Sequence, residues 1–179
     1  MSGKTFIWDL DGTLLDSYGV IVSSLRRTLA ELNVPMEEEE IRRRATAGSV
    51  SDVVNYATAA TGRAFSDIKA RYSEISGGRY LEITTTPHAR EALEETAALA
   101  ADHFVYTHRG RTTAPVLEHL GLDRFFKEVV SSLNGFPRKP APDALLYLME
   151  AHGLERDRVY YVGDRTLDVD CAANAGVTS

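Results

Sequence analysis

The stretch Phe6-Ile7-Trp8-Asp9-Leu10-Asp11-Gly12-Thr13 decides the fold of this chain. The β-branched and aromatic run at residues 5–8 predicts a short strand that is buried on both faces. That strand stops at Asp9 and Asp11, which point the same way because alternate residues of a strand share a face. In an open α/β sheet, the carboxyl ends of the strands form the edge where ligands bind.

The two carboxylates have more than one interpretation. Neighbouring like charges raise each other's proton affinity unless a cation lies between them. Asp9 and Asp11 therefore favour either a divalent metal site or a nucleophile paired with a general acid/base. An acidic turn is about as good an explanation of this stretch taken alone, because Asp-x-Asp-Gly also suits a turn after a strand.

Composition limits the class of protein. The chain has 179 residues, 44% of them hydrophobic, which is enough for one domain with a subdomain. Its formal net charge of -6 argues against nucleic acid or an anionic membrane as the main partner. The single cysteine, Cys171, excludes an intrachain disulfide framework. With no apolar run long enough for a membrane span or a signal core, we expect a cytoplasmic protein.

Residues 17–80 carry no convincing strand and predict an all-helical insert. Apolar residues recur at helical spacing between Ser17 and Leu32, and Asn33-Val34-Pro35 ends that helix. A second helix follows over residues 37–44, and a third begins after a cap at Ser49 or Ser51. A fourth covers residues 66–76. The expected organisation is a catalytic core of residues 1–16 and 81–179, with a helical subdomain of residues 17–80 between its two parts.

From His88 onward, helices and strands alternate. Apolar runs predict strands at residues 103–106, 128–131 and 158–162, each preceded by a helix, over residues 88–99, 112–120 and 142–152 respectively. Asp168 is expected to open a last short helix. This alternation predicts an α/β fold, a three-layer Rossmann-like parallel sheet with helices on both faces.

Each predicted strand ends near a residue whose side chain could bind a metal ion or phosphate. Asp9 and Asp11 follow the first, Thr107 the second, Lys139 the third and Asp164 the fourth. Mg²⁺ prefers hard oxygen ligands, and a lysine ammonium and a hydroxyl suit phosphate oxygens. Each residue taken singly also fits a plain turn, surface or helix-capping role. Their ordered appearance at successive strand ends favours a site for phosphate and Mg²⁺.

These motifs resemble those of the haloacid dehalogenase superfamily. The resemblance is to its phosphatases with a helical cap, the group of phosphoglycolate phosphatase and β-phosphoglucomutase. It rests on four motifs that span essentially the whole chain: Asp9-Leu-Asp11-Gly-Thr-Leu-Leu-Asp-Ser, Thr107, Lys139-Pro-Ala-Pro and Gly163-Asp164-Arg-Thr-Leu-Asp168.

The resemblance implies a role for each motif residue. Asp9 would be the nucleophile that forms an aspartyl-phosphate, and Asp11 the general acid/base. Mg²⁺ would be bound by the carboxylate of Asp9, the main-chain carbonyl of Asp11, and Asp164. Asp168 would contact these ligands or reach the ion through a water molecule. Thr107 and Lys139 would hold the phosphate. Because haloacid dehalogenases need neither an acid/base at the position of Asp11 nor a metal, a phosphatase is favoured over a dehalogenase.

Two features depart from the family pattern. His108 and Arg109 follow Thr107 where relatives often carry Asn. Both residues are candidates for substrate binding, although His108 is equally suited to capping the turn. The chain also ends at Ser179, where relatives continue with another core strand, so we expect a truncated sequence in which residues 176–178 begin that strand.

Substrate choice is expected to lie in the helical insert. In relatives of this kind the loop at residues 45–51 folds over the leaving group, which makes Gly48 a further candidate for substrate binding. We expect a small phosphorylated metabolite as substrate, and a monomer or weak homodimer. A sugar phosphomutase of the β-phosphoglucomutase type and a non-catalytic phospho-accepting regulatory module are the alternatives.

Overall fold

The computed structural model describes residues 3–99 and 101–179. The chain divides into two compact units. The first takes the chain up to Asp16 together with Thr84–Ser179, and the second is Ser17–Ile83.

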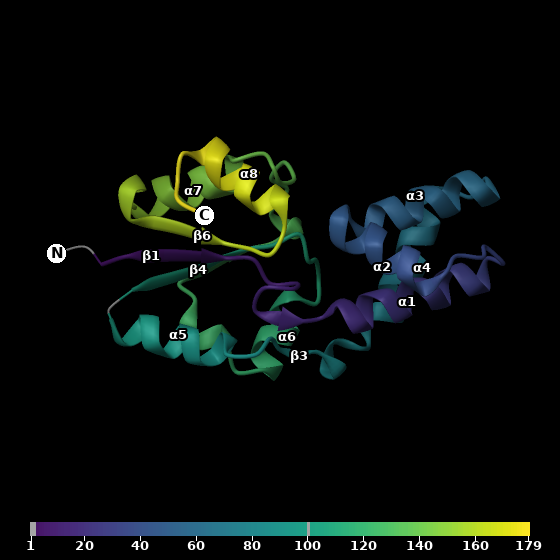
Figure 1. The fold of residues 1–179 in the computed structure, drawn as a ribbon, viewed down its shortest axis with the longest axis horizontal. Helices are drawn as coiled ribbons and strands as arrows, with labels where there is room; N and C mark the ends of the chain where they lie inside the picture. The colour runs from purple at the N-terminus through teal and green to yellow at the C-terminus, as the bar shows by residue number, and fades with distance from the viewer. Residues whose placement is uncertain (1–2, 100) are drawn as a thin grey trace. The chain divides into compact units, whose positions relative to one another are not determined.

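Four parallel strands form the sheet of the first unit (Figure 1), in the order β5-β4-β1-β6. β1 is central because it pairs in parallel with β4 on one side and with β6 on the other. The parallel sheet predicted from the apolar runs is therefore confirmed. The strands are β1 (Thr5–Trp8), β4 (Asp102–Tyr106), β5 (Glu128–Val130) and β6 (Val159–Val162).

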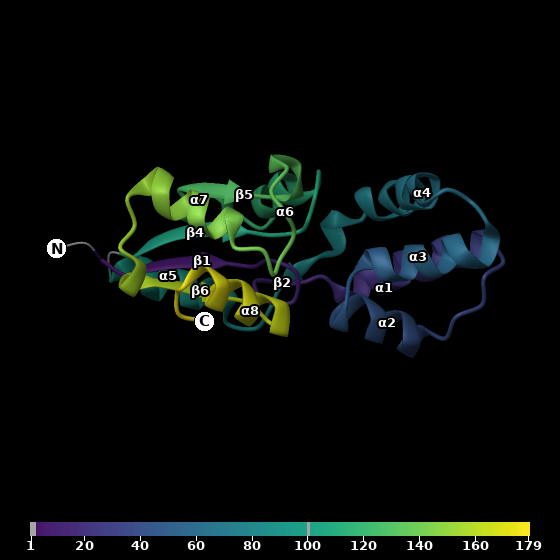
Figure 2. The same ribbon diagram turned by 90° about the horizontal axis from the view of Figure 1, so that it is seen from above.

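Helices cover both faces of this sheet, which gives the predicted three layers. Figures 1 and 2 show α5 (Ala89–Ala98) and α6 (Thr113–His119) on one face and α7 (Asp143–His152) and α8 (Thr166–Ala175) on the other. The second pair packs on the sheet through a core that includes Leu145, Leu148, Cys171, Ala172, Ile7, Phe104 and Tyr161. Short 3₁₀ turns complete this unit at Asp123–Phe125, Ser132–Asn134 and Arg156–Arg158.

A small antiparallel pair lies outside the main sheet. β2 (Leu15–Asp16) pairs with β3 (Thr84–Thr85), so the residues that precede and follow the helical unit lie side by side. The sequence analysis did not predict this pair, because each strand has two residues and no periodicity to detect.

The last helix differs from its expected start. α8 begins at Thr166, so the prediction that Asp168 opens the helix was wrong by two residues. Asp168 instead lies at the third helical position, where its Oδ2 accepts a hydrogen bond from the main-chain N–H of Arg165 at 3.1 Å. After this helix, Thr178 makes an isolated parallel bridge with Tyr160 at the outer edge of β6.

The second unit consists of helices around their own core. They are α1 (Tyr18–Glu31), α2 (Glu38–Ala47), α3 (Val50–Thr61) and α4 (Phe65–Gly77), followed by a 3₁₀ turn at Tyr80–Glu82. The predicted helical insert is thus present. Its buried residues follow helical spacing and include Val22, Leu25, Leu29, Ile41, Val53, Val54, Ala57 and Ile68. Among residues 3–99 and 101–179, none of the helices combines the length and the apolar character needed to cross a membrane.

Candidate active site

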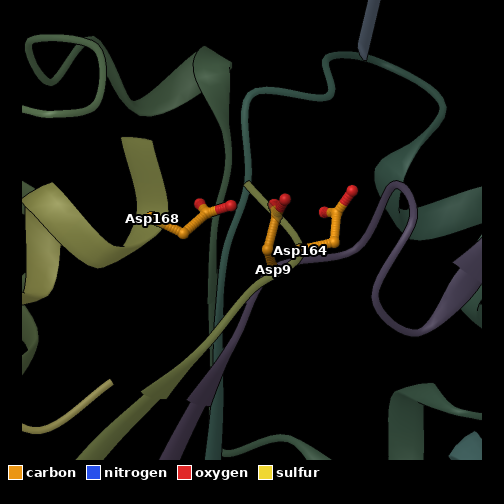
Figure 3. A group of neighbouring side chains, drawn as sticks. All are labelled: Asp9, Asp164 and Asp168. Carbon is orange, nitrogen blue, oxygen red and sulfur yellow. The ribbon is translucent and has the colours of Figure 1, made fainter. Parts of the chain in front are cut away.

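The candidate site lies at the carboxyl edge of the main sheet. Asp9 follows β1 directly, Thr107 follows β4 directly, and Asp164 comes two residues after β6. Lys139 enters from the loop before α7, and Asp168 from the first turn of α8. Figure 3 shows Asp9, Asp164 and Asp168 as neighbours at this edge. The parallel sheet therefore brings together residues that are far apart in the sequence, because the ends of its strands meet at one edge.

Asp9 is almost completely buried, with 1% of its surface exposed. Its main-chain N–H donates to the carbonyl of Val162 at 2.8 Å, which fixes the chain as it leaves β1. Burial raises the pKa of the Asp9 carboxyl, and the positive charge of Lys139 opposes that rise. Among the described residues, no donor makes a hydrogen bond to Asp9 Oδ2. A buried carboxylate oxygen that accepts no hydrogen bond is suited to binding a ligand that supplies positive charge.

Lys139 lies between two carboxylates. Its Nζ is 2.9 Å from Asp9 Oδ1 and 2.7 Å from Asp168 Oδ1, and its side chain is fully buried. The ammonium group also lies over the ring of Tyr106, 5.0 Å from the centroid, and over that of Tyr161, at 5.2 Å. These contacts fix one positive charge beside the carboxylate of Asp9.

Asp168 is held by groups of the protein itself. Oδ1 accepts hydrogen bonds from Lys139 Nζ and, at 3.1 Å, from the hydroxyl of Tyr161. Oδ2 accepts from the main-chain N–H of Arg165. Because both oxygens are already engaged, Asp168 is better placed to fix Lys139 than to be a principal metal ligand.

Asp11 is paired with Arg109. Asp11 Oδ1 accepts hydrogen bonds from Nε of Arg109 at 3.1 Å and from Nη2 at 2.5 Å. Arg109 is anchored in turn, since its Nη1 donates to Thr112 Oγ1 at 2.9 Å and its main-chain N–H donates to Thr107 Oγ1 at 3.2 Å. Arg109 was predicted as a substrate-binding residue, and the structure places its guanidinium against the carboxylate of Asp11.

His108 contacts the loop that carries Lys139. Its Nε2 accepts a hydrogen bond from the main-chain N–H of Lys139 at 2.9 Å, and its Nδ1 lies 3.0 Å from Nη2 of Arg138. Burial, together with the positive charges of Arg138, Lys139 and Arg165, lowers the pKa of His108 to about 3. The imidazole is therefore neutral at physiological pH.

Three carboxylates form a group that could hold a metal ion. One oxygen each from Asp9, Asp164 and Asp168 lies within 4.8 Å of the others. Asp164 is solvent-exposed, and its Oδ1 accepts a hydrogen bond from Thr13 Oγ1 at 3.2 Å. Such an all-oxygen set, open to water on one side, fits Mg²⁺, which keeps several waters when it binds. The side chain of Asp11 does not belong to this group.

Arg165 is a site residue that the sequence analysis missed. Its Nη2 lies 3.7 Å from Asp9 Oδ2 and its Nε 3.9 Å from Asp168 Oδ2. It adds a second positive charge beside Asp9, with only 14% of its side chain exposed. Its place between Asp164 and the last helix was the only signal in the sequence, and an arginine in a loop is too common to indicate a site.

Gly48 belongs to the second unit and directly follows α2. A Cβ atom at this position would clash with Asp52 Oδ2. That oxygen accepts a hydrogen bond from the main-chain N–H of Ser49 at 2.8 Å, at the start of α3. The absence of a side chain at Gly48 therefore lets the loop between α2 and α3 close tightly, and its part in substrate binding stays a prediction.

The chain is similar in sequence to known proteins along nearly its whole length. The family model described as "Haloacid dehalogenase-like hydrolase" matches residues 6–179. The phosphoglycolate phosphatase of Vibrio parahaemolyticus is 30% identical over 195 residues, covering 98% of this chain and 82% of that protein. The phosphoglycolate phosphatase of Pseudomonas savastanoi pv. phaseolicola is 29% identical, covering 97% of this chain and 67% of that protein.

Solved structures show the same fold. A crystal structure described as a predicted phosphoglycolate phosphatase from Haemophilus somnus 129PT has a TM-score of 0.86 and 25% identity, covering 99% of this chain and 84% of that one. A HAD-superfamily hydrolase of subfamily IA from Geobacter sulfurreducens has a TM-score of 0.74 at 24% identity, covering 98% of this chain and 85% of that one. The α/β fold with its helical region is therefore one already known from crystals.

Proposed function

Because the chain belongs to the haloacid dehalogenase-like hydrolase family, we propose that it is a Mg²⁺-dependent phosphatase of a small phosphorylated metabolite. The family assignment confirms the resemblance seen in the motifs. The reaction proposed for this site proceeds through an aspartyl-phosphate on Asp9.

The observation that carries the proposal is the environment of Asp9. Its carboxylate is buried, points into the site at the end of β1 and has the ammonium group of Lys139 at 2.9 Å. In the first step, an oxygen of Asp9 attacks phosphorus and the bond from phosphorus to the leaving-group oxygen breaks. Lys139 and Arg165 offset the negative charge that gathers as phosphate and carboxylate meet.

Asp11 is suited to the proton transfers. It would donate a proton to the departing alcohol oxygen in the first step. In the second, it would take a proton from a water that attacks phosphorus, and the bond between phosphorus and Asp9 would break to release inorganic phosphate. Arg109 holds Oδ1 of Asp11 in place, which would orient the carboxyl group for these transfers.

Asp9, Asp164 and the main-chain carbonyl of Asp11 are the groups that would hold Mg²⁺, with Asp168 acting through Lys139 or a water. When bound, Mg²⁺ supplies positive charge that neutralises the transferring phosphoryl group. Thr107 would donate its hydroxyl to the phosphate oxygens.

The relatives suggest which substrate to try first. Several proteins similar to this chain are phosphoglycolate phosphatases. Phosphoglycolate is therefore the first candidate, followed by sugar phosphates. Because one fold serves many substrates, the choice among these candidates is made by a direct screen.

The test is hydrolysis of p-nitrophenyl phosphate by the wild type and by Asp9→Asn, with Mg²⁺ and with EDTA. Asp157→Asn is the matched control, because Asp157 is an exposed acid in a 3₁₀ turn. We expect turnover that requires Mg²⁺, that falls to background in Asp9→Asn and that is unchanged in Asp157→Asn. A screen of phosphoglycolate and sugar phosphates would follow.

Three outcomes would contradict the proposal in different ways. Substantial activity in Asp9→Asn would refute the nucleophile. An acyl-phosphate that forms on the wild type and is never released would identify a regulatory module. Transfer of the phosphoryl group to a second sugar phosphate, in preference to water, would identify a mutase.

A further inference from the structure

His108 links two strand ends of the site. It lies one residue after Thr107 at the end of β4, and its Nε2 accepts the main-chain N–H of Lys139, 31 residues further along the chain. Lys139 in turn places its Nζ against Asp9 Oδ1 and Asp168 Oδ1. The main chain of this lysine is therefore held by His108, and its ammonium group by the two carboxylates.

The hydrogen bond fixes the tautomer of the ring. A main-chain N–H can only donate, so Nε2 must accept and the proton of the neutral ring must lie on Nδ1. The guanidinium of Arg138, 3.0 Å from Nδ1, can also only donate. In this tautomer the Arg138 contact is not a hydrogen bond, whereas the contact with Lys139 is one and orients the ring.

A neighbouring residue holds the same loop. The hydroxyl of Tyr106 donates to the carbonyl of Pro137 at 3.1 Å. Its ring meets that of His108 edge-on, with the centroids 6.0 Å apart and an interplanar angle of 82°. Tyr106 and His108 thus fasten the loop two residues apart, at Pro137 and at Lys139. A loop attached at two points to the end of a strand can position a side chain more narrowly than one attached only at its ends.

We propose that His108 is a positioning residue, which holds the main chain of Lys139 so that its ammonium group lies against Asp9 and the phosphate. His108 transfers no proton in this role. Neutrality of the ring supports it, since a charged imidazole would carry a proton on Nε2 and lose the acceptor that Lys139 needs. The kinetic part of the proposal rests on the phosphatase function, whereas the structural part does not.

The test compares His108→Gln with His108→Asn. The amide oxygen of glutamine can take the place of Nε2 as acceptor, whereas asparagine is one methylene shorter and falls short of the Lys139 N–H. His119→Gln is the control, because His119 is an exposed histidine at the end of α6. The measurements are binding of inorganic phosphate by calorimetry, amide hydrogen exchange of Lys139 by NMR, and the pH profile of turnover.

We expect His108→Asn to weaken phosphate binding about tenfold, which is the scale of one lost hydrogen bond, and to speed exchange of the Lys139 amide. His108→Gln should restore both towards the wild-type values, and neither variant should remove a limb of the pH profile. An Nδ1–H signal that persists across neutral pH in the ¹⁵N spectrum of the wild type would confirm the tautomer.

Three results would overturn the proposal: equal losses in the Gln and Asn variants, unchanged exchange of the Lys139 amide in folded His108→Asn, or loss of one limb of the pH profile. The last would identify an acid/base role. If the chain hydrolyses no phosphate ester at all, the exchange measurement still decides whether His108 holds Lys139. Failure of the proposed function and failure of this inference are therefore distinguishable.

Discussion

Lys139 and Asp168 form a buried ion pair, with Nζ 2.7 Å from Oδ1 and both side chains at 2% exposure or less. The same ammonium group also forms an ion pair with Asp9, with Nζ 2.9 Å from Oδ1. One positive charge therefore keeps two buried carboxylates together. Without it, the two buried carboxylates would have only the more distant guanidinium group of Arg165 to offset their negative charges.

Replacing that lysine should destabilise the protein. Lys139→Met leaves Asp9 and Asp168 buried without their shared cation, and removing one partner of a buried pair costs about 3 kcal/mol of unfolding free energy. Urea denaturation measures the change. The control is Lys127→Met, since Lys127 pairs with Asp102 at 2.7 Å on the surface, with 55% and 40% of the side chains exposed. We expect that control to cost at most about 1 kcal/mol.

The same variant gives a second readout. With one cation gone from the site, Mg²⁺ should bind the carboxylates more tightly and raise the melting temperature of Lys139→Met more than that of the wild type, because the stabilisation by a ligand increases with its affinity for the folded state. An equal Mg²⁺ effect in both proteins would show that the ion does not bind at these carboxylates.

Arg109→Met should impair the departure of poor leaving groups selectively. Arg109 fixes the orientation of Asp11, the proposed acid. A nitrophenolate leaves without a proton, whereas an alkoxide needs one. Loss of orientation should therefore lower kcat/KM, which reports the steps up to departure of the leaving group, about tenfold for an alkyl phosphate and much less for p-nitrophenyl phosphate. Steady-state kinetics with both substrates measure the ratio.

The control for this prediction is Arg111→Met, because Arg111 is an exposed arginine in the same loop. A rise in KM that is the same for both substrates, with kcat unchanged, would contradict the positioning role. It would indicate instead that Arg109 binds the substrate directly, the role predicted from the sequence.

The free energy of unfolding of the first unit should decrease as the pH drops below neutrality, because His103 takes up a proton more readily in the unfolded chain. The indole N–H of Trp8 donates to Nδ1 of His103 at 3.0 Å, and burial lowers the pKa of this histidine below its usual 6.5. A histidine with a lowered pKa takes up its proton more readily when unfolded. Stability is therefore complete above pH 6.5 and declines as the pH falls from that value towards the lower pKa of the folded state.

Thermal melts of the wild type and of His103→Asn between pH 5 and pH 8 measure this effect. Trp8 is the only tryptophan of the chain, so its fluorescence reports directly on the pair. We expect the difference between the two proteins to shrink as the pH falls. A difference that stays constant with pH would show that His103 does not titrate on unfolding.

The sequence predicted the sheet well because the signal for each strand is local. Each apolar run, from Thr5–Trp8 to Val159–Val162, is bounded by polar or glycine residues, and buried parallel strands need little else to be recognised. The convergence of Asp9, Thr107 and Asp164 also followed from topology alone, since parallel strands end at one edge.

The contacts inside the site were beyond such reasoning. That Arg109 meets Asp11, or that His108 meets the main chain of Lys139, depends on side-chain directions in loops that carry no periodic pattern. Arg165 was missed for the same reason. The short strands β2 and β3 were missed because they are defined only by their pairing with each other, across the whole helical unit.

That pairing has a consequence for how such a protein can change. The first unit contains the antiparallel pair formed by Leu15–Asp16 and Thr84–Thr85. The chain leaves the first unit after Asp16 and returns to it at Thr84, so its exit and return points are adjacent. A segment anchored in this way costs little chain entropy to lengthen, shorten or replace, since its ends are already together. The helical unit can therefore vary in length and sequence while the sheet of the first unit stays unchanged.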